Sequence, residues 1–303
     1  MTEILLYLYI YSFIGWIYES IYVSIKKKRW INRGFMHGPF LTIYGFGGIL
    51  CVLSGSLSQG ETLTMFIYAV FICSLMELVT GVTMEKLFRV RYWDYTNIPF
   101  NVRGYICPPV SLFWGVLAII VNRYIHVYLT GALSVVSQSY LELFTYVLTI
   151  VFAVDFTISF MEATDLRKML EVISERNRSI EDIKLRFEDV KEMIPIDTSS
   201  LKIFSLGMRD SINESQKSFD LKIEQHYNKQ RETLDKLKDR IRELPEKKDK
   251  VFEFSVSVSK LQNLMKNGLN QISKGPKKML KRNPYITSTD YKEILEMLKK
   301  INN

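Results

Sequence analysis

Cysteine and histidine are both rare in this sequence, with three residues of each type among 303. The three cysteines lie in or beside apolar runs without a C-x-x-C spacing, so they predict small buried residues and exclude a disulfide framework. The three histidines stand far apart, and His226 lies alone in a charged stretch. The sequence therefore predicts no metal site and no bound cofactor.

A phosphate-binding loop is also missing, because the pattern G-x-x-x-x-G-K-[ST] occurs nowhere in the chain. The chain is thus not a conventional ATPase by itself. No nucleophile–base pair stands out, which leaves catalytic residues unknown and makes an enzyme the less favoured interpretation. The net charge of +8 follows from basic loops and a basic tail, so it gives no reason to expect nucleic acid as a partner.

Charged side chains are scarce in residues 1–163, which hold 19 of the 72 Asp, Glu, Lys and Arg residues. This part contains apolar runs near the roughly 20 residues that a helix needs to cross a bilayer core. Helices are expected because open sheet edges cannot be satisfied in lipid. The predicted fold class is all-α: an integral membrane bundle of about five transmembrane helices, followed by a cytoplasmic helical hairpin or coiled-coil region. The expected spans are 4–25, 40–57, 63–82, 105–121 and 141–161, and the regular part of the fourth is expected to start after Pro109.

Basic residues alternate between the loops and so predict an orientation. Residues 26–33 and 86–103 hold nine Lys and Arg residues, whereas the loop after the second span holds none and the loop after the fourth only Arg123. By the positive-inside rule the N-terminus lies outside and the C-terminal region lies in the cytoplasm. The first span is expected to be a retained helix and not a signal peptide, because Glu3 stands where a basic residue would precede the apolar run.

Four acidic residues fall inside the expected spans, where a charged side chain is costly and usually functional. They are Glu19, Glu77, Glu85 and Asp155. Most of this acid lies in the cytoplasmic half of the membrane, where the cytoplasmic loops supply three arginines, with His37 nearby. The pattern predicts one polar cluster open to the cytoplasm. This cluster is either a set of structural Glu–Arg pairs or the lining of a substrate, ion or catalytic site.

The two expected cytoplasmic loops have an unusual composition. Residues 33–48 hold five glycines, which allow close backbone approach and interrupt regular helix. Residues 91–107 hold five aromatic side chains, which suit the headgroup layer. Irregular backbone at membrane depth needs protein or a water-filled cavity around it. The candidate substrate- or ion-binding residues are Glu19, Arg33, His37, Glu77, Glu85, Trp93, Asp94, Asn101, Arg103 and Asp155.

A series of short motifs runs through the first half of the chain. The motifs are Gly15-Trp16-x-x-Glu19, Arg33-Gly34-Phe35-x-x-Gly38-Pro39, Ile43-Tyr44-Gly45-x-Gly47, Glu77-x-x-x-Gly81-x-x-x-Glu85, Trp93-Asp94-Tyr95 and Asn101-x-x-Gly104-x-Ile106. Together they resemble the ABC-transporter type IV family of permeases, also called CmpB-like, over roughly residues 1–160. The resemblance implies a bacterial permease subunit of the plasma (inner) membrane. Such a subunit would need a separate ATPase subunit.

The second half of the chain is charged, and its periodicity predicts helices. Residues 164–245 are expected to form a helical or coiled-coil region, either an antiparallel hairpin or a parallel dimer, with its second helix at about 212–244. Residues 246–303 are expected to hold a basic linker and a last helix at about 290–301. The basic cluster Lys274–Arg282 is either a site for anionic lipid or part of a disordered linker, which Pro276 and Pro284 favour.

Three functions follow from these patterns. The leading hypothesis is a multi-pass, permease-like subunit of a bacterial transport system with a cytoplasm-facing polar cavity. Its expected partners are the lipid bilayer, a separate ATPase subunit and a second copy of the chain. The second hypothesis is an intramembrane enzyme that acts on lipid or headgroup substrates, with His37 in acid–base work. The third is a membrane scaffold that presents the helical tail to a partner.

Overall fold

The computed structural model describes residues 2–191, 256–257 and 274–302, and these residues form helices and connecting loops without a strand. The chain divides into two compact units. We name them the membrane unit, which comprises Met1–Thr164 with Lys278–Asp290, and the tail unit, which comprises Asp165–Lys277 with Tyr291–Asn303. The membrane unit therefore takes in a short segment from near the end of the chain.

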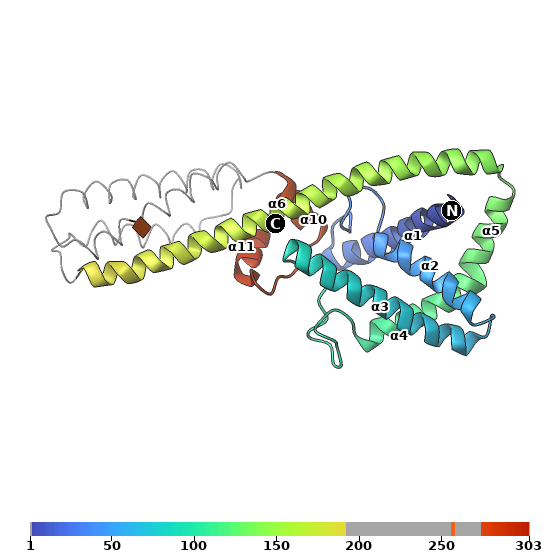
Figure 1. Cartoon of the computed structure of the whole chain (residues 1–303), viewed down its shortest axis with the longest axis horizontal. Coiled ribbons are helices and arrows are strands. Elements are labelled where there is room, and N and C mark those ends of the chain that lie inside the picture. Colours follow the sequence, from blue (N-terminus) through green and yellow to red (C-terminus); the bar gives the residue numbers. More distant parts are fainter. Residues whose placement is uncertain (1, 192–255, 258–273, 303) are drawn as a thin grey trace. The chain divides into compact units, whose positions relative to one another are not determined.

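Apolar helices build the membrane unit (Figure 1). They are α1 (Thr2–Lys27), α2 (Thr42–Leu57), α3 (Thr62–Phe88), α4 (Pro108–Ile120), the π-helical turn η1 (Val121–Ile125), α5 (His126–Ser134) and the first part of α6 (Gln138–Lys191). Among the described residues, four helical stretches are long and apolar enough to cross a membrane: Thr2–Lys27, Thr62–Phe88, Pro108–Ser134 and Gln138–Ser179. At the position of the second expected span, α2 is an apolar helix of 16 residues. The predicted all-α membrane bundle is confirmed.

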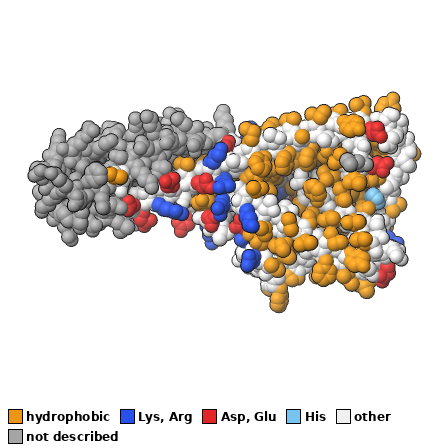
Figure 2. Space-filling model, in the orientation of Figure 1, with side chains coloured by type: hydrophobic (Ala, Val, Ile, Leu, Met, Phe, Trp, Pro, Cys, Tyr) orange, Lys and Arg blue, Asp and Glu red, His pale blue; other side chains and the backbone are white. Residues whose placement is uncertain are grey.

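The outer surface of this unit is apolar, as contact with lipid requires. Hydrophobic side chains cover the face that Figure 2 presents. Phe71 and Leu75 of α3, for example, are 71% and 61% exposed. In water such a continuous apolar surface would cause aggregation, whereas in a bilayer it makes favourable contact with the lipid chains.

The fourth span differs from the one expected. It begins at Pro108 and not after Pro109, because the first turn of a helix tolerates proline. It also continues past residue 121 to Ser134 through η1. There the Asn122 side chain donates hydrogen bonds to the carbonyl oxygens of Cys51 and Ala118, at 2.7 and 2.9 Å. The helix passes through this polar residue because the amide finds partners inside the protein.

Helix α6 runs without a break from Gln138 to Lys191, across the boundary expected between residues 163 and 164. Residues 138–191 contain neither Gly nor Pro, so no residue interrupts the helix. The tail unit buries Leu166, Met169, Leu170 and Ile173 of α6, together with Leu295 and Leu298 of α11 (Lys292–Asn302). The second expected tail helix, at about 212–244, lies outside the described residues.

Residues 274–290 differ from the disordered linker expected there. Lys274–Arg282 form helix α10, and Met279 and Ile286 are fully buried. The backbones of Arg91 and Thr287 exchange two hydrogen bonds, of 2.7 and 2.9 Å. Neither proline opposes this structure, because Pro276 fits the first turn of α10 and Pro284 follows its end. The segment therefore contains a regular helix, and side chains of its residues 278–290 pack into the membrane unit.

The centre of the membrane unit is a buried cluster from α1, α2, α3, α4 and η1. Its members are Tyr11, Cys51, Met65, Ala69, Cys73, Trp114, Ala118 and Val121. All three cysteines are free and buried, as the sequence predicted. Helices α1 and α2 approach closely at glycines of α2, since a Cβ added to Gly45 would meet the Leu8 carbonyl oxygen at 2.7 Å.

This close contact predicts a difference between two glycine-to-alanine variants. A methyl group at Gly45 must displace the backbone of Leu8, whereas Gly131 in α5 has no atom within 4 Å of the new Cβ. Both variants gain the same helix propensity, of about 1 kcal/mol. We expect Gly45→Ala to be less stable than Gly131→Ala by about 1–3 kcal/mol, because overpacking forces the helices apart. The measurement is the Tm of each purified variant in detergent, and equal Tm values would show that the contact between α1 and α2 is not this tight.

Candidate functional site

The loop between α1 and α2, residues 28–41, is irregular but well bonded. Two serines of α1 hold it: the backbone N–H of Ile31 donates to Ser24 Oγ at 2.9 Å, and that of Arg33 donates to Ser20 Oγ at 3.1 Å. Asn32 closes the loop, because its Nδ2 donates to the His37 carbonyl oxygen at 2.6 Å. Internal partners of this kind are what non-helical backbone at membrane depth requires.

A cavity of about 330 Å³ lies inside the membrane unit, between this loop, α1–α4, the loop 89–107 and α6. Three charged side chains line it: Glu19 of α1, Arg33 of the loop and Glu77 of α3. Most of the remaining lining is apolar or aromatic. The cavity therefore combines a large apolar wall with a few polar groups, which is the usual composition of a small-molecule site.

The Arg33 side chain is largely buried, at 11% exposure, and it contacts three partners. Its Nη2 donates to the Tyr92 carbonyl oxygen at 2.8 Å, its Nη1 donates to Asn283 Oδ1, and its Nε lies 3.8 Å from Glu19 Oε2. Burial lowers the pKa of the Arg33 guanidinium, and the charge of Glu19 acts against that shift. Arginine stays charged in proteins, so this part of the cavity holds a buried ion pair.

Glu77 is in a different environment, although it lines the same cavity. Its side chain is buried and accepts hydrogen bonds from the Tyr95 hydroxyl at 3.1 Å and from Trp114 Nε1 at 3.4 Å. Burial, with the charge of Glu77, raises the pKa of Tyr95 above its ordinary value, which keeps that hydroxyl protonated as a donor. Within the described ranges no Lys, Arg or His forms an ion pair with Glu77.

Aromatic side chains form the wall near the two carboxylates. The rings of Tyr44 and Trp114 lie 5.5 Å apart, and Phe113 contacts Trp114 at 6.3 Å. Tyr44 also donates its hydroxyl to Glu19 at 3.0 Å. Trp93 lines the cavity from the loop 89–107, with its Nε1 donating to the Tyr105 carbonyl oxygen at 2.9 Å. The rings are thus fixed by hydrogen bonds and ring contacts.

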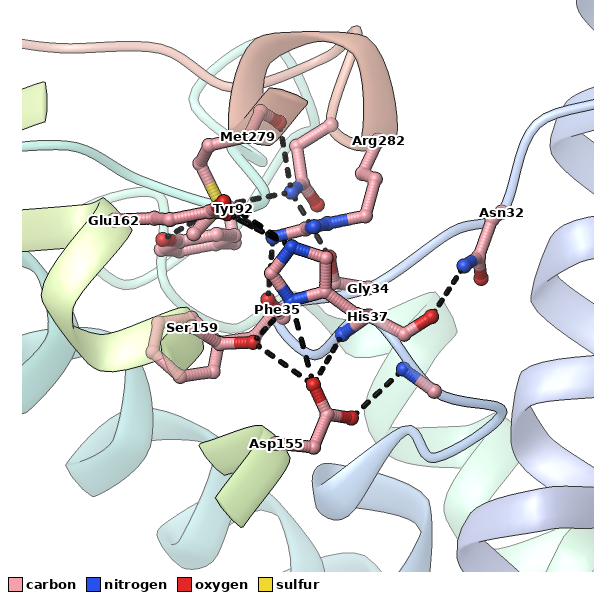
Figure 3. A network of polar contacts seen from close by, with 12 residues as sticks. Asn32, Gly34, Phe35, His37, Tyr92, Asp155, Ser159, Glu162, Met279 and Arg282 are labelled. Carbon is pink, nitrogen blue, oxygen red and sulfur yellow. Dashed lines mark hydrogen bonds and ion pairs between the residues drawn. The ribbon is translucent and has the colours of Figure 1, made fainter. Parts of the chain in front are cut away.

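A second polar cluster surrounds His37 (Figure 3). Its Nδ1 lies 3.1 Å from Ser159 Oγ and 3.3 Å from Asp155 Oδ1, and its Nε2 lies 3.1 Å from Glu162. Asp155 also accepts hydrogen bonds from the backbone N–H groups of His37 and Gly38, at 3.0 and 2.7 Å. Asp155 and Glu162, together with the serine between them, therefore fasten the loop 28–41 to α6.

The C-terminal segment 278–290 completes this cluster. Arg282 donates to Glu162 Oε2 at 3.0 Å and to the Phe35 carbonyl oxygen at 3.2 Å (Figure 3). Asn283 donates to the Gly34 carbonyl oxygen at 2.9 Å and accepts from Arg33. The two residues connect the His37 cluster to the wall of the cavity.

A third polar cluster joins α3, the loop 89–107 and the same C-terminal segment. Glu85 accepts hydrogen bonds from Arg91 Nε at 2.7 Å, from the Tyr105 hydroxyl at 2.5 Å and from the Thr289 hydroxyl at 2.9 Å. The bond to Glu85, with burial, raises the pKa of Tyr105. Asp94 accepts from the Thr287 hydroxyl at 3.2 Å. This cluster holds α3, the loop 89–107 and the C-terminal segment together, and it does not line the cavity.

Asn101 and Arg103 have local roles. Asn101 braces a turn, because its Nδ2 donates to the Ile98 carbonyl oxygen at 2.7 Å and its Oδ1 accepts from the Gly104 N–H at 2.8 Å. Arg103 is exposed in the left-handed region, with φ +50°, and its guanidinium forms no ion pair with any described residue. The turn explains the conformation of both residues.

The structure thus divides the ten candidate residues, for which one cluster was expected. Glu19, Arg33, Glu77 and Trp93 line the cavity, His37 and Asp155 form the second cluster, and Glu85 and Asp94 belong to the third. Sequence reasoning missed Ser159 and Glu162, although their spacing of four and seven residues from Asp155 places all three on one helix face. It also missed Arg282, which it read as one of several surface cations. Nothing in the sequence pointed to Asn283.

The pair of Arg282 and Glu162 predicts a selective loss of stability. Both side chains are buried, at 8% and 11% exposure, so removing the guanidinium leaves the carboxylate without its cation. We expect Arg282→Ala to lose about 3–5 kcal/mol of stability and Lys281→Ala, at an exposed neighbouring position, to lose almost none. Hydrogen–deuterium exchange of residues 278–290 should rise in the first variant only. Equal exchange in both variants would mean that other contacts hold the segment.

A model of the family described as "Putative ABC-transporter type IV" matches residues 6–160, about half of the chain. No curated protein and no solved structure matches it. The matched region contains Glu19, Arg33 and Glu77 of the cavity and stops before Glu162 and the C-terminal segment. The chain belongs to the ABC-transporter type IV (CmpB) family.

Proposed function

We propose that this chain is a permease-like subunit of a bacterial transport system and that the cavity of the membrane unit binds its substrate. The observation that carries the proposal is the cavity itself, since about 330 Å³ lies among apolar helices beside two carboxylates and a guanidinium. Membrane-spanning helices keep buried charge where it binds substrates or ions. The family to which the chain belongs supports a role in transport.

The proposed cavity faces the cytoplasm. Its wall includes residues of the loops 28–41 and 89–107, and the positive-inside rule assigns both loops to that side. Tyr92, Trp93 and Tyr95 are the lining residues from the second loop. A substrate would therefore meet the polar groups of the cavity near the cytoplasmic surface of the plasma membrane.

Two partners belong to this proposal. The sequence has no phosphate-binding loop, so ATP-driven transport requires a separate ATPase subunit. A single bundle of this size also offers few helices for a complete pathway, which favours a homodimer with two cavities.

Transport is favoured over lipid chemistry by the contacts of His37. Ser159, the nearest hydroxyl, is fully buried, and both ring nitrogens of His37 contact side chains of α6. Both ring nitrogens of His37 therefore already have protein partners, so acid–base work on a lipid would first require these contacts to break.

Affinity purification of the full chain from its native membranes in mild detergent tests the proposed function. We expect a protein with a G-x-x-x-x-G-K-[ST] loop to copurify in near-stoichiometric amount, identified by mass spectrometry. A Glu77→Gln variant should retain this partner, because Glu77 is buried inside the unit.

An unrelated multi-pass protein with the same tag, purified from the same membranes, is the control. If the chain is purified with no more ATPase than that control, the proposal of a permease subunit fails.

A further inference from the structure

The charges around the cavity are unevenly balanced. Glu19 is paired with Arg33 at 3.8 Å, and Arg33 also donates to the Tyr92 carbonyl oxygen and to Asn283. Glu77 receives hydrogen bonds from neutral donors only. The cavity therefore presents one carboxylate that has no counter-charge among the described residues, in surroundings that exclude water from most of its side chain.

Aromatic rings gather around this carboxylate. Tyr95 and Trp114 donate hydrogen bonds to it, so both rings lie beside it, and Trp93 lines the cavity close by. A Cβ added at Gly81, one helical turn after Glu77, would meet Trp93 Cζ2 at 3.3 Å, which places that indole against the same face of α3. Aromatic rings attract cations, most strongly where water is excluded, and rings beside a carboxylate are the usual surroundings of a bound ammonium group.

Other ligand charges fit this arrangement less well. An anion would meet two carboxylates, while the guanidinium of Arg33 is already committed to three partners. A hard metal cation takes six or more oxygen ligands, and the two side chains that bond to Glu77 are one phenol and one indole. A bulky organic cation needs neither a second charge nor a full shell of oxygens.

We propose that the cavity binds an organic cation that carries a substituted ammonium group, with the nitrogen between Glu77 and the rings of Trp93, Tyr95 and Trp114. The apolar body of the ligand would lie along the side of the cavity formed by Phe113, Phe156 and Phe160. This inference rests on the cavity of the proposed function and names its class of substrate. It does not depend on an ATPase partner.

Calorimetric titration of the purified full chain in a maltoside detergent tests the inference. The probes are choline and its neutral isostere 3,3-dimethyl-1-butanol, which has the same shape without the charge. We expect choline to bind at least about tenfold more tightly than the isostere, because the carboxylate and the rings attract only the cation.

Two substitutions separate charge from shape. Glu77→Gln keeps an acceptor for Tyr95 and removes the charge, so choline affinity should fall about tenfold or more. Glu61→Gln, at the exposed start of α3, is the matched control and should bind choline like the unaltered chain. Trp93→Leu removes one ring and should weaken choline binding several-fold more than it weakens binding of the isostere, because only the cation is attracted by the ring.

The inference is overturned if the titration with choline shows no binding heat of either sign, if the neutral isostere binds as tightly, or if Glu77→Gln binds choline unchanged. The comparison of the two probes needs no variant, so it decides the matter even if a substitution prevents folding. Choline binding without a copurified ATPase would support the ligand class and remove the permease role. A copurified ATPase without choline binding would support the permease role and overturn the ligand class.

Discussion

The guanidinium of Arg33 lies where four segments of the chain meet, two of them distant in sequence from the others. It contacts Glu19 of α1, the backbone of the loop 89–107 at Tyr92, and Asn283 of the C-terminal segment, and it belongs itself to the loop 28–41. A buried charge must be satisfied on every side, so its partners fix the positions of the segments that carry them. All four of these segments contribute residues to the wall of the cavity.

The stretch Tyr44–Gly48 of α2 has two roles, because it packs α2 closely against α1 and also leaves room for the rings that line the cavity. Gly45 and Gly48 bring α1 and α2 close together, since a Cβ at Gly48 would lie 2.5 Å from the Tyr11 ring. Gly47 leaves room for the Trp114 ring, which a Cβ there would meet at 2.5 Å. Tyr44, one turn earlier, points its hydroxyl to Glu19. Small residues thus pack the helices, and large rings between them bound the cavity.

More of the fold than of the candidate site could be predicted from the sequence. Apolar runs predicted the helices because a bilayer imposes length and hydrophobicity locally, and the acids at Glu19 and Glu77 stood out for the same reason. The partners of those acids were not predictable, since Arg33 and Asn283 are 250 residues apart and Arg282 and Glu162 are 120 apart. No local pattern encodes such pairings. The lysines around Arg282 suggested a surface patch, and only the packing of Met279 and Asn283 reveals a buried segment.

The membership of residues 278–290 in the membrane unit has a consequence for the order of biosynthesis. The spans up to Thr164 enter the bilayer first, and more than a hundred further residues are made before Arg282 and Asn283 leave the ribosome. During that interval Arg33 and Glu162 lack partners that they have in the folded chain. The segment 278–290 completes the bundle last, so premature termination between residues 164 and 282 yields inserted helices with an incomplete charge network. Such a product would be a natural target for membrane quality control.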